Sequence, residues 1–340
     1  MSTATESVTK LRNAPVIMRT RVAGQWSHPL YFSRGDEKVV RIGDELYIAT
    51  IHGAGWLGDS LVTTTADLVQ ALSRFGADDL VNAIGADMRG SLCIYLQSRE
   101  GYHILPDPLG ATMLYEYRSS NNWAYSSDLE SLIAAIKEFG EHPQKSIEYL
   151  VEVIATGNGG FFPTSYSDVD SLPPFSHVFI SDDDIRKGTY KFSETFFERP
   201  ASMEDLFDEA RSDLIRNVTA VAKSNIGTRI SHLTGGFDSR LILAALLNSR
   251  QHEGFRYMCS GSIQMPDRKI AGNLCGHLGI PLTNSDGTIK SAYIPGNAMF
   301  GTHGMVRSDL PASSLPDHVL MSGGYGECAC ALFMDHATMQ

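Results

Sequence analysis

The residues best suited to chemistry in this chain lie between Ser231 and Arg240, in the order Ser-His-Leu-Thr-Gly-Gly-Phe-Asp-Ser-Arg. Gly235 and Gly236 would let backbone N–H groups approach an anion closely, because glycine has no side chain. Asp238 offers the hard oxygen ligands that Mg²⁺ prefers. The segment predicts a phosphate-binding loop, although it is no Walker A sequence, since no Gly-Lys-Ser/Thr follows at the required spacing. Taken alone, the stretch also fits an ordinary glycine turn between a strand and a helix.

The elements around this loop are those that a phosphate site needs. Residues 228–233 predict a short buried strand before it, and the Leu- and Ala-rich residues 241–247 predict a helix after it. The N-terminus of that helix would add partial positive charge to the loop. Residues 255–261 predict a second parallel strand, Pro266 opens a helix that Gly279 ends, and residues 319–321 predict a third strand.

The first part of the chain, to about residue 195, predicts short strands with few helices. Residues 38–42 and 45–51 flank Gly43-Asp44, a typical hairpin signal. Thr65 is expected to cap a helix, residues 91–96 predict a buried strand, and residues 107–110 read Asp-Pro-Leu-Gly, a turn. Arg199-Pro200 is a plausible domain boundary, and Ser202 is expected to cap a long helix behind it.

Composition limits the classes of function. The chain has 340 residues, 43% of them hydrophobic, and its length favours two domains. The formal net charge of -11 argues against nucleic acid as a partner. No apolar stretch approaches a membrane span or a signal core, so we expect a soluble, cytoplasmic protein that binds no membrane. We expect free thiols in a reducing compartment, because no Cys-x-x-Cys pair occurs among Cys93, Cys259, Cys275, Cys328 and Cys330.

The glycine loop resembles the Ser-Gly-Gly-x-Asp-Ser pyrophosphate loop of ATP pyrophosphatases, with Thr234 in place of the first Ser. The resemblance extends along the chain to the asparagine synthetase family. Residues 107–110, 114–115 and 124–132 are similar to consecutive segments of the glutaminase-type domain of that family, and residues 171–177 are similar to its Leu-Pro-Pro-Gly-His element. The family is also related to β-lactam synthetases and lasso peptide cyclases.

This resemblance implies an α/β fold in two domains. Residues 1–198 would form a glutaminase-like α-β-β-α sandwich of the N-terminal nucleophile hydrolase type. Residues 199–340 would form a doubly wound α/β ATP-pyrophosphatase domain, apparently truncated at its C-terminal end. In such a fold, ligands lie at the carboxyl ends of the parallel strands.

The resemblance also implies ATP and Mg²⁺ as ligands and assigns the residues that hold them. Asp238 and Ser239 would take part in catalysis, and Asp238 and Glu327 would hold Mg²⁺. The substrate would be a small-molecule or peptide carboxylate. The predicted ATP and pyrophosphate site consists of Leu233, Thr234, Gly235, Gly236, Asp238, Ser239, Ser260, Ser322 and Gly323.

The chain departs from the family at both ends. The family's glutaminases have a nucleophilic Cys where this chain has Ser2, and an N-terminal hydroxyl beside its own amine can also act as a nucleophile. Ser2 lies in a polar leader, so we expect the sandwich to be structural or vestigial. The family's C-terminal catalytic Lys has no counterpart, since no Lys follows Lys290. A truncated product and a missing part supplied by a separate chain both stay open, as does a homodimer.

Three functions compete on this basis. The first is asparagine synthesis from aspartate by a glutamine-hydrolysing asparagine synthase. The second is a specialised cyclising amide ligase of the β-lactam-synthetase or lasso-peptide-cyclase type, which the missing N-terminal Cys favours. The third is a non-catalytic nucleotide-binding remnant, which the missing C-terminal Lys favours. Arg240, which stands in place of the family's second Ser, is compatible with the divergence that the second function implies.

Overall fold

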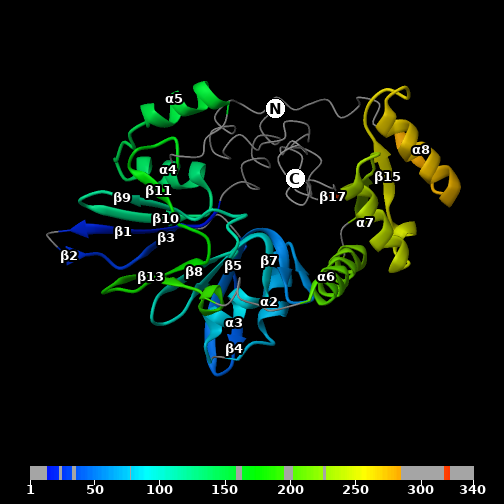
Figure 1. Cartoon of the computed structure of the whole chain (residues 1–340). Coiled ribbons are helices and arrows are strands. Elements are labelled where there is room, and N and C mark those ends of the chain that lie inside the picture. Colours follow the sequence, from blue (N-terminus) through cyan, green and yellow to red (C-terminus); the bar gives the residue numbers. More distant parts are fainter. Residues whose placement is uncertain are drawn as a thin grey trace. The chain divides into compact units, whose positions relative to one another are not determined.

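The computed structural model describes residues 14–22, 25–32, 36–76, 78–157, 163–194, 202–224, 227–284 and 318–321. The chain divides into two compact units. Among the described residues, the first unit runs to Glu194 and the second begins at Ser202. Figure 1 labels the elements of both units.

The first unit contains two antiparallel sheets. One has the strand order β11-β9-β10-β1-β2, and β3 also pairs with β1. Its strands are β1 (Val16–Val22), β2 (Gln25–Trp26), β3 (Leu30–Phe32), β9 (Tyr115–Arg118), β10 (Asn122–Ser126) and β11 (Val169–Ser171).

The other sheet has the order β13-β12-β8-β7-β5-β4, and β6 also pairs with β5. The predicted hairpin is confirmed: β4 and β5 pair through a turn in which Gly43 has a φ of 59°, a conformation that favours glycine. The strands are β4 (Lys38–Ile42), β5 (Glu45–Leu57), β6 (Ser60–Val62), β7 (Met88–Gln97), β8 (Tyr102–Pro106), β12 (Ser176–Ile180) and β13 (Ile185–Thr189).

Helices cover the outer faces of both sheets, as Figure 1 shows. Apolar residues of α2 (Thr65–Leu72) and α3 (Leu80–Asp87) pack with those of β4, β5 and β7 in one core. Residues of α4 (Leu129–Glu138) pack with β1, β9 and β10 in a second core. The unit also contains α5 (Ile147–Thr156) and the 3₁₀ turn η1 (Lys191–Glu194).

A third core lies between the two sheets. Ile17 and Tyr125 from one sheet pack there with Cys93, Tyr95 and Val178 from the other. Alternate residues of a strand face opposite sides of a sheet, so each sheet can fill two cores at once. The layers therefore follow in the order helix, sheet, sheet, helix, which is the order that the family resemblance implies.

One local prediction for this unit needs correction, and one helix was not predicted. The cap of α2 is Thr64, whose side chain accepts a hydrogen bond from the Asp67 backbone in a complete capping box, so Thr65 is the first helical residue. Three threonines occur in a row, and the position of Asp67 three residues after Thr64 selects the cap. The helix α5 was not predicted, although Ser146 caps it and Gly157 ends it in the left-handed conformation.

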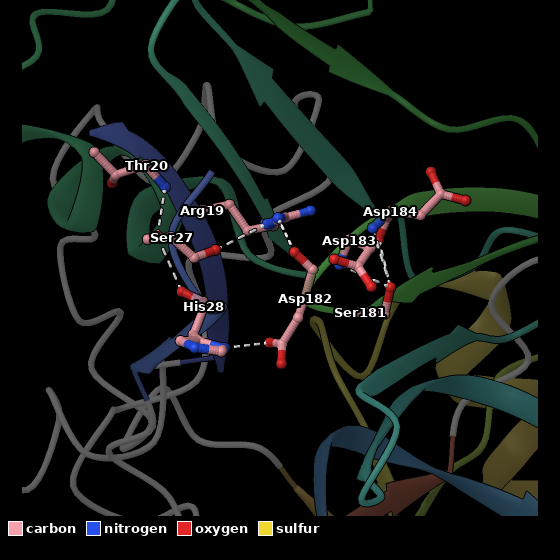
Figure 2. A network of polar contacts seen from close by, with 8 residues as sticks. All are labelled: Arg19, Thr20, Ser27, His28, Ser181, Asp182, Asp183 and Asp184. Carbon is pink, nitrogen blue, oxygen red and sulfur yellow. Dashed lines mark hydrogen bonds and ion pairs between the residues drawn. The ribbon is translucent and has the colours of Figure 1, made fainter. Parts of the chain in front are cut away.

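A polar network joins the two sheets at one edge (Figure 2). The buried Arg19 of β1 donates from Nε to the Ser27 carbonyl oxygen at 3.2 Å and from Nη2 to the Asp182 carbonyl oxygen. His28 Nδ1 lies 2.6 Å from Asp182 Oδ1. Burial lowers the pKa of Arg19, and the carboxylates of Asp182, Asp183 and Asp184 oppose that shift. The acidic turn between β12 and β13 thus offsets a buried positive charge.

We expect the half-buried His103 of β8 to make the protein sensitive to acid. Burial, together with the nearby His177 and Arg186, lowers the pKa of His103 from 6.5 to about 4. Between these values the unfolded chain binds a proton that the folded chain does not bind, so stability falls as the pH falls through this window. The expected loss is about 2 kcal/mol, after allowance for partial solvent exposure.

Urea unfolding of the wild type and of His103→Gln at pH 7 and pH 4.5 measures this contribution. The variant should lose less stability than the wild type on acidification. His142→Gln is the matched control, because His142 is exposed and its substitution should leave the pH dependence unchanged. Equal acid sensitivity of His103→Gln and the wild type would show that another group causes the loss.

The second unit is a parallel α/β layer. Its four-stranded sheet has the order β16-β15-β14-β17, and every neighbouring pair is parallel. The predicted cap at Ser202 and the end of the second crossover helix at Gly279 are confirmed. The strand β16 was not predicted. The elements are α6 (Met203–Lys223), β14 (Thr228–His232), α7 (Phe237–Asn248), η2 (His252–Gly254), β15 (Arg256–Cys259), α8 (Pro266–Leu278), β16 (Leu282–Asn284) and β17 (His318–Met321).

Candidate functional site

The strand order of the second unit identifies one edge of its sheet as the place for a ligand. From β14 the chain moves to β15 and then to β16 on one side, whereas β17 joins β14 on the other side. The strand order therefore reverses between β14 and β17. In open parallel sheets, ligands bind outside the carboxyl ends of the strands at such a switch point. The loop that follows β14 lies at this position.

The loop begins with an anchored residue. Leu233 is fully buried, and its backbone N–H donates to the Met258 carbonyl oxygen of β15 at 2.8 Å. Gly236 is the N-cap of α7, and no side chain bonds to the N-terminus of this helix as a cap in the described structure. The N–H groups of the first turn have no partner inside a helix and carry its partial positive charge. They are suited to an anion.

Two hydroxyl groups hold the loop in shape. The buried Ser239 accepts a hydrogen bond from the Thr234 backbone N–H at 3.0 Å, and its Oγ lies 3.1 Å from Thr234 Oγ1. Thr234 Oγ1 also accepts from the Gly236 backbone N–H at 3.0 Å. The predicted residues Thr234 and Ser239 are therefore brought together, and both bond within the loop. Their first role is to fix the backbone.

The N-terminus of α8 packs directly against the loop. The Gly235 backbone N–H donates to Asp267 Oδ1 at 3.1 Å. A Cβ atom at position 235 would lie 2.7 Å from that oxygen and 2.8 Å from Cδ1 of Ile270, so this approach requires glycine. The contact also shows that the Gly235 amide can donate a hydrogen bond to an anionic oxygen. Sequence reasoning treated Asp267 only as the start of a helix and missed this contact.

Ser260 reaches the same edge from the neighbouring strand. It follows β15 directly, and its Oγ lies 3.2 Å from Nε2 of His232, the last residue of β14. The structure thus places the predicted Ser260 beside the end of the strand that leads into the loop. His232 was not among the predicted residues. Its place as the last strand residue before a glycine loop is the sequence signal that could have identified it.

Asp238 is the second residue of α7 and is half-buried. Among the residues that the structure describes, no group of three or more His, Cys, Asp or Glu side chains could hold a metal ion. The predicted second ligand, Glu327, lies outside the described residues, as do Ser322 and Gly323. Met321 ends β17, so Ser322 follows directly in the sequence after a strand that flanks the switch point.

The first unit contains no thiolate nucleophile among its described residues. Cys93 lies fully buried between the two sheets, and burial raises the pKa of its thiol to about 12. A thiol of this kind stays protonated and unreactive near neutral pH. Cys93, Cys259 and Cys275 are all free and buried, which confirms the predicted free thiols for these three residues. Ser2, the other candidate nucleophile, lies outside the described residues.

Comparisons with known proteins give weak likenesses. No protein-family model and no curated protein sequence matches the chain. Among solved structures, it aligns with glutamine phosphoribosylpyrophosphate amidotransferase from B. subtilis, complexed with ADP and GMP, at 12% identity and a TM-score of 0.30, over 75% of this chain and 61% of that chain. It aligns with a structure described as the allosteric regulatory enzyme of purine biosynthesis at 10% identity and a TM-score of 0.32, over 94% of this chain and 77% of that chain.

The chain thus spans 61% of the length of the first of these proteins. These alignments do not identify a reaction for this chain. In the described parts of the chain, no helix is both long and apolar enough to cross a membrane.

Proposed function

We propose that the protein is an asparagine-synthetase-like, ATP-dependent ligase that forms amides. A substrate carboxylate oxygen would attack the α-phosphorus of ATP, the bond to the β-phosphate oxygen would break, and pyrophosphate would leave with the electron pair. An amine would then attack the acyl carbon, lose a proton and displace AMP. The observation that supports this proposal best is the glycine loop at the carboxyl end of β14, with the uncapped N-terminus of α7 behind it.

The described residues fit a pyrophosphate group. The first turn of α7 would hold its oxygens, because its N–H groups lie at a helix N-terminus. The Gly235 and Gly236 amides would join them by exchanging Asp267 Oδ1 and Thr234 Oγ1 for phosphate oxygens. Thr234 and Ser239 would keep these donors in place. Asp238 would hold Mg²⁺ together with Glu327, and this ion would neutralise charge on the phosphates.

The nucleotide would extend from the pyrophosphate towards the ends of the neighbouring strands. Leu233 and Ser260 would line its pocket from β14 and β15, and Ser322 and Gly323 would approach from the other side. The hydrogen bond between His232 and Ser260 supports this arrangement, because it places a polar group at the junction of two strand ends.

We further propose that the first unit is a sandwich of the N-terminal nucleophile hydrolase type that has lost glutaminase activity. The order of its four layers supports the fold, and the buried, protonated thiol of Cys93 supports the loss of a cysteine nucleophile. Glutamate release from glutamine that depends on Ser2 would contradict the inactive assignment.

A cyclising amide ligase is the second candidate. Such an enzyme uses an amine within its own substrate and needs no ammonia from glutamine. The described residues of the first unit include no reactive thiol, because Cys93 is buried, and this favours the alternative. Asparagine synthesis from aspartate requires a separate nitrogen donor, and a nucleotide-binding remnant requires no substrate at all.

Exchange of labelled pyrophosphate into ATP separates these functions. Exchange that depends on aspartate supports asparagine synthesis, and exchange that depends only on an amino-acid derivative or a peptide carboxylate supports the cyclising ligase. ATP binding without pyrophosphate exchange for any carboxylate would support the third function, a non-catalytic nucleotide-binding remnant. The wild-type chain without a carboxylate is the background control.

Asp267 gives a prediction about the strength of anion binding. Its carboxylate occupies the Gly235 amide, so it competes with a phosphate oxygen and repels it. Asp267→Asn keeps an oxygen acceptor but removes the negative charge. We expect pyrophosphate to bind about tenfold more tightly to this variant at low salt, because one unit of like-charge repulsion is removed.

Isothermal titration calorimetry with pyrophosphate measures the effect in about 20 mM and about 300 mM NaCl. The Debye lengths at these salt concentrations are about 20 Å and about 6 Å. The gain should be smaller at high salt. Asp208→Asn is the matched control, because Asp208 is an exposed acid on α6. A weaker affinity in Asp267→Asn would mean that Asp267 organises the loop and does not compete with the anion.

A further inference from the structure

A cavity of about 400 Å³ opens in the first unit and is lined by residues of that unit alone. It lies where β9 and β11 of one sheet face β12 and β13 of the other. Its lining combines charged and hydroxyl side chains with apolar ones, which is typical of small-molecule sites. The groups that decide its chemistry are Glu116, Asp170, Ser171, Ser176, Lys187 and Thr189.

Strand alternation explains why charged groups face this interior. Glu116 lies between Tyr115 and Tyr117, whose side chains pack in the core under α4, so Glu116 faces the opposite side. Asp170 is the direct partner of Glu116 across the β9–β11 pair, and both therefore face the space between the sheets. From the other sheet, Lys187 pairs with Val178, which belongs to the core between the sheets.

Glu116 is built into the site. Its residue is only 8% exposed, its Oε1 accepts a hydrogen bond from the Tyr125 hydroxyl at 2.5 Å, and its Oε2 pairs with Lys187 Nζ. Burial raises the pKa of the Tyr125 phenol, and the hydrogen bond to Glu116 raises it further. The hydroxyl therefore stays protonated and remains a donor. The Lys187 side chain is 47% exposed and reaches solvent at the cavity.

The charges of the lining do not cancel. Glu116 and Asp170 are two carboxylates, whereas Lys187 is the single cation among the residues that line the cavity. Lys187 neutralises the buried Glu116, because a carboxylate without a partner would be costly there. The exposed Asp170 then carries the excess negative charge at the entrance. A ligand with one net positive charge would complete the balance.

We propose that this cavity binds a free basic amino acid. Its side-chain cation would pair with Asp170, and its α-carboxylate would bind Lys187 and the hydroxyls of Ser176 and Thr189. Its α-ammonium group would lie near the Glu116 carboxylate, and its methylene groups would contact Leu172. This site is independent of ATP and of the ligase function proposed above, because it lies within the first unit and uses none of the loop residues.

Calorimetry with the full chain tests the proposal by matched ligands. L-arginine or L-lysine should bind with a dissociation constant of about 1 mM or better, the range of a weak specific site. L-citrulline has nearly the shape of arginine but a neutral side chain, and agmatine is arginine without its carboxylate. Each should bind at least about tenfold more weakly than arginine, because each loses one charge-assisted contact.

Two variants test the residues. Asp170→Asn should weaken the binding of arginine by about tenfold and leave the binding of citrulline unchanged, since only arginine carries the side-chain charge. Asp44→Asn, which changes an exposed acid in the β4–β5 turn outside the cavity lining, is the control and should bind arginine as the wild type does. Lys187→Met removes the partner of buried Glu116 and can lower stability, so its folding is checked by circular dichroism.

Several results would overturn the proposal. One is the absence of detectable heat for both basic amino acids at 10 mM, about ten times the expected dissociation constant. Equal affinities for arginine and citrulline, or unchanged arginine binding in Asp170→Asn, would also exclude recognition by Asp170. Because these experiments contain no nucleotide, their failure leaves the ligase proposal untouched, and failed pyrophosphate exchange leaves this site untouched.

Discussion

Replacing Gly235 by alanine is expected to weaken ATP binding by about 100-fold, which corresponds to about 3 kcal/mol. The new methyl group would lie 2.7 Å from Asp267 Oδ1 and 2.8 Å from Cδ1 of Ile270. Both atoms are the ends of side chains that would have to turn away, and the backbone Cα of Asp267, at 3.2 Å, would have to yield as well. That movement would turn the Gly235 amide away from the position where a phosphate oxygen is expected.

A glycine in the same unit provides the matched control. Gly272 lies within α8, and a Cβ there would meet no atom within 4 Å. Gly272→Ala should therefore bind ATP normally and gain about 1 kcal/mol of stability, because alanine favours a helix more than glycine does. Calorimetry with MgATP and thermal unfolding monitored by circular dichroism measure both properties. Wild-type affinity in Gly235→Ala would exclude this loop as the phosphate site.

Gly236→Ala separates the effect of crowding from the loss of a glycine. Its Cβ would meet only Thr234 Oγ1, at 3.1 Å. The Thr234 hydroxyl can rotate away, whereas a Cβ at position 235 would also lie 3.2 Å from the backbone Cα of Asp267, which cannot. We therefore expect Gly236→Ala to weaken ATP binding less than Gly235→Ala does.

The sequence predicted the second unit well where each element has its own local signal. The strand before the loop, the helix after it, and the helix from Pro266 to Gly279 were all found, because glycine, proline and apolar periodicity mark their ends. The short strand β16 was missed, since three residues carry too little pattern to stand out. Only its pairing with β15 defines it as a strand.

Contacts between segments distant in sequence could not be predicted in the same way. Asp267 bonds to Gly235, and Ser260 lies beside His232, only because α8 and β15 pack against β14. A residue's type suggests what it can bind, but its partner depends on tertiary packing. The sequence therefore identified the donors of the proposed phosphate site. It did not reveal the Asp267 carboxylate, which accepts a hydrogen bond from one of these donors, the Gly235 amide.

The same difference holds in the first unit. The Asp107–Gly110 turn was predicted from Pro and Gly, and Gly110 has the expected left-handed φ of 75°. In contrast, Glu116 lies within an apolar-looking strand between two tyrosines, and nothing nearby in the sequence reveals Lys187 as its partner. The cavity between the sheets follows from their stacking and has no motif of its own.

Replacing Asp238 by alanine is expected to remove the Mg²⁺-dependent part of ATP binding. Asp238 lies at the N-terminus of α7, beside the donors of the proposed pyrophosphate site. With Mg²⁺ present, we expect the affinity of Asp238→Ala for ATP to fall by about 100-fold, since a bound divalent ion is the strongest local charge in such a site. The cost in stability should be small, about 0.5 kcal/mol, because one favourable acid at a helix N-terminus is lost.

Removal of the metal distinguishes a ligand role from a general loss of structure. Without Mg²⁺, Asp238 would only repel the phosphates, so Asp238→Ala should then bind ATP at least as tightly as the wild type does. A damaged loop would instead weaken binding under both conditions. Titrations with ATP in EDTA and in excess Mg²⁺, with Asp208→Ala as the control on α6, give the four affinities required. If Mg²⁺ strengthens ATP binding equally in the wild type and in Asp238→Ala, the metal is held by other residues.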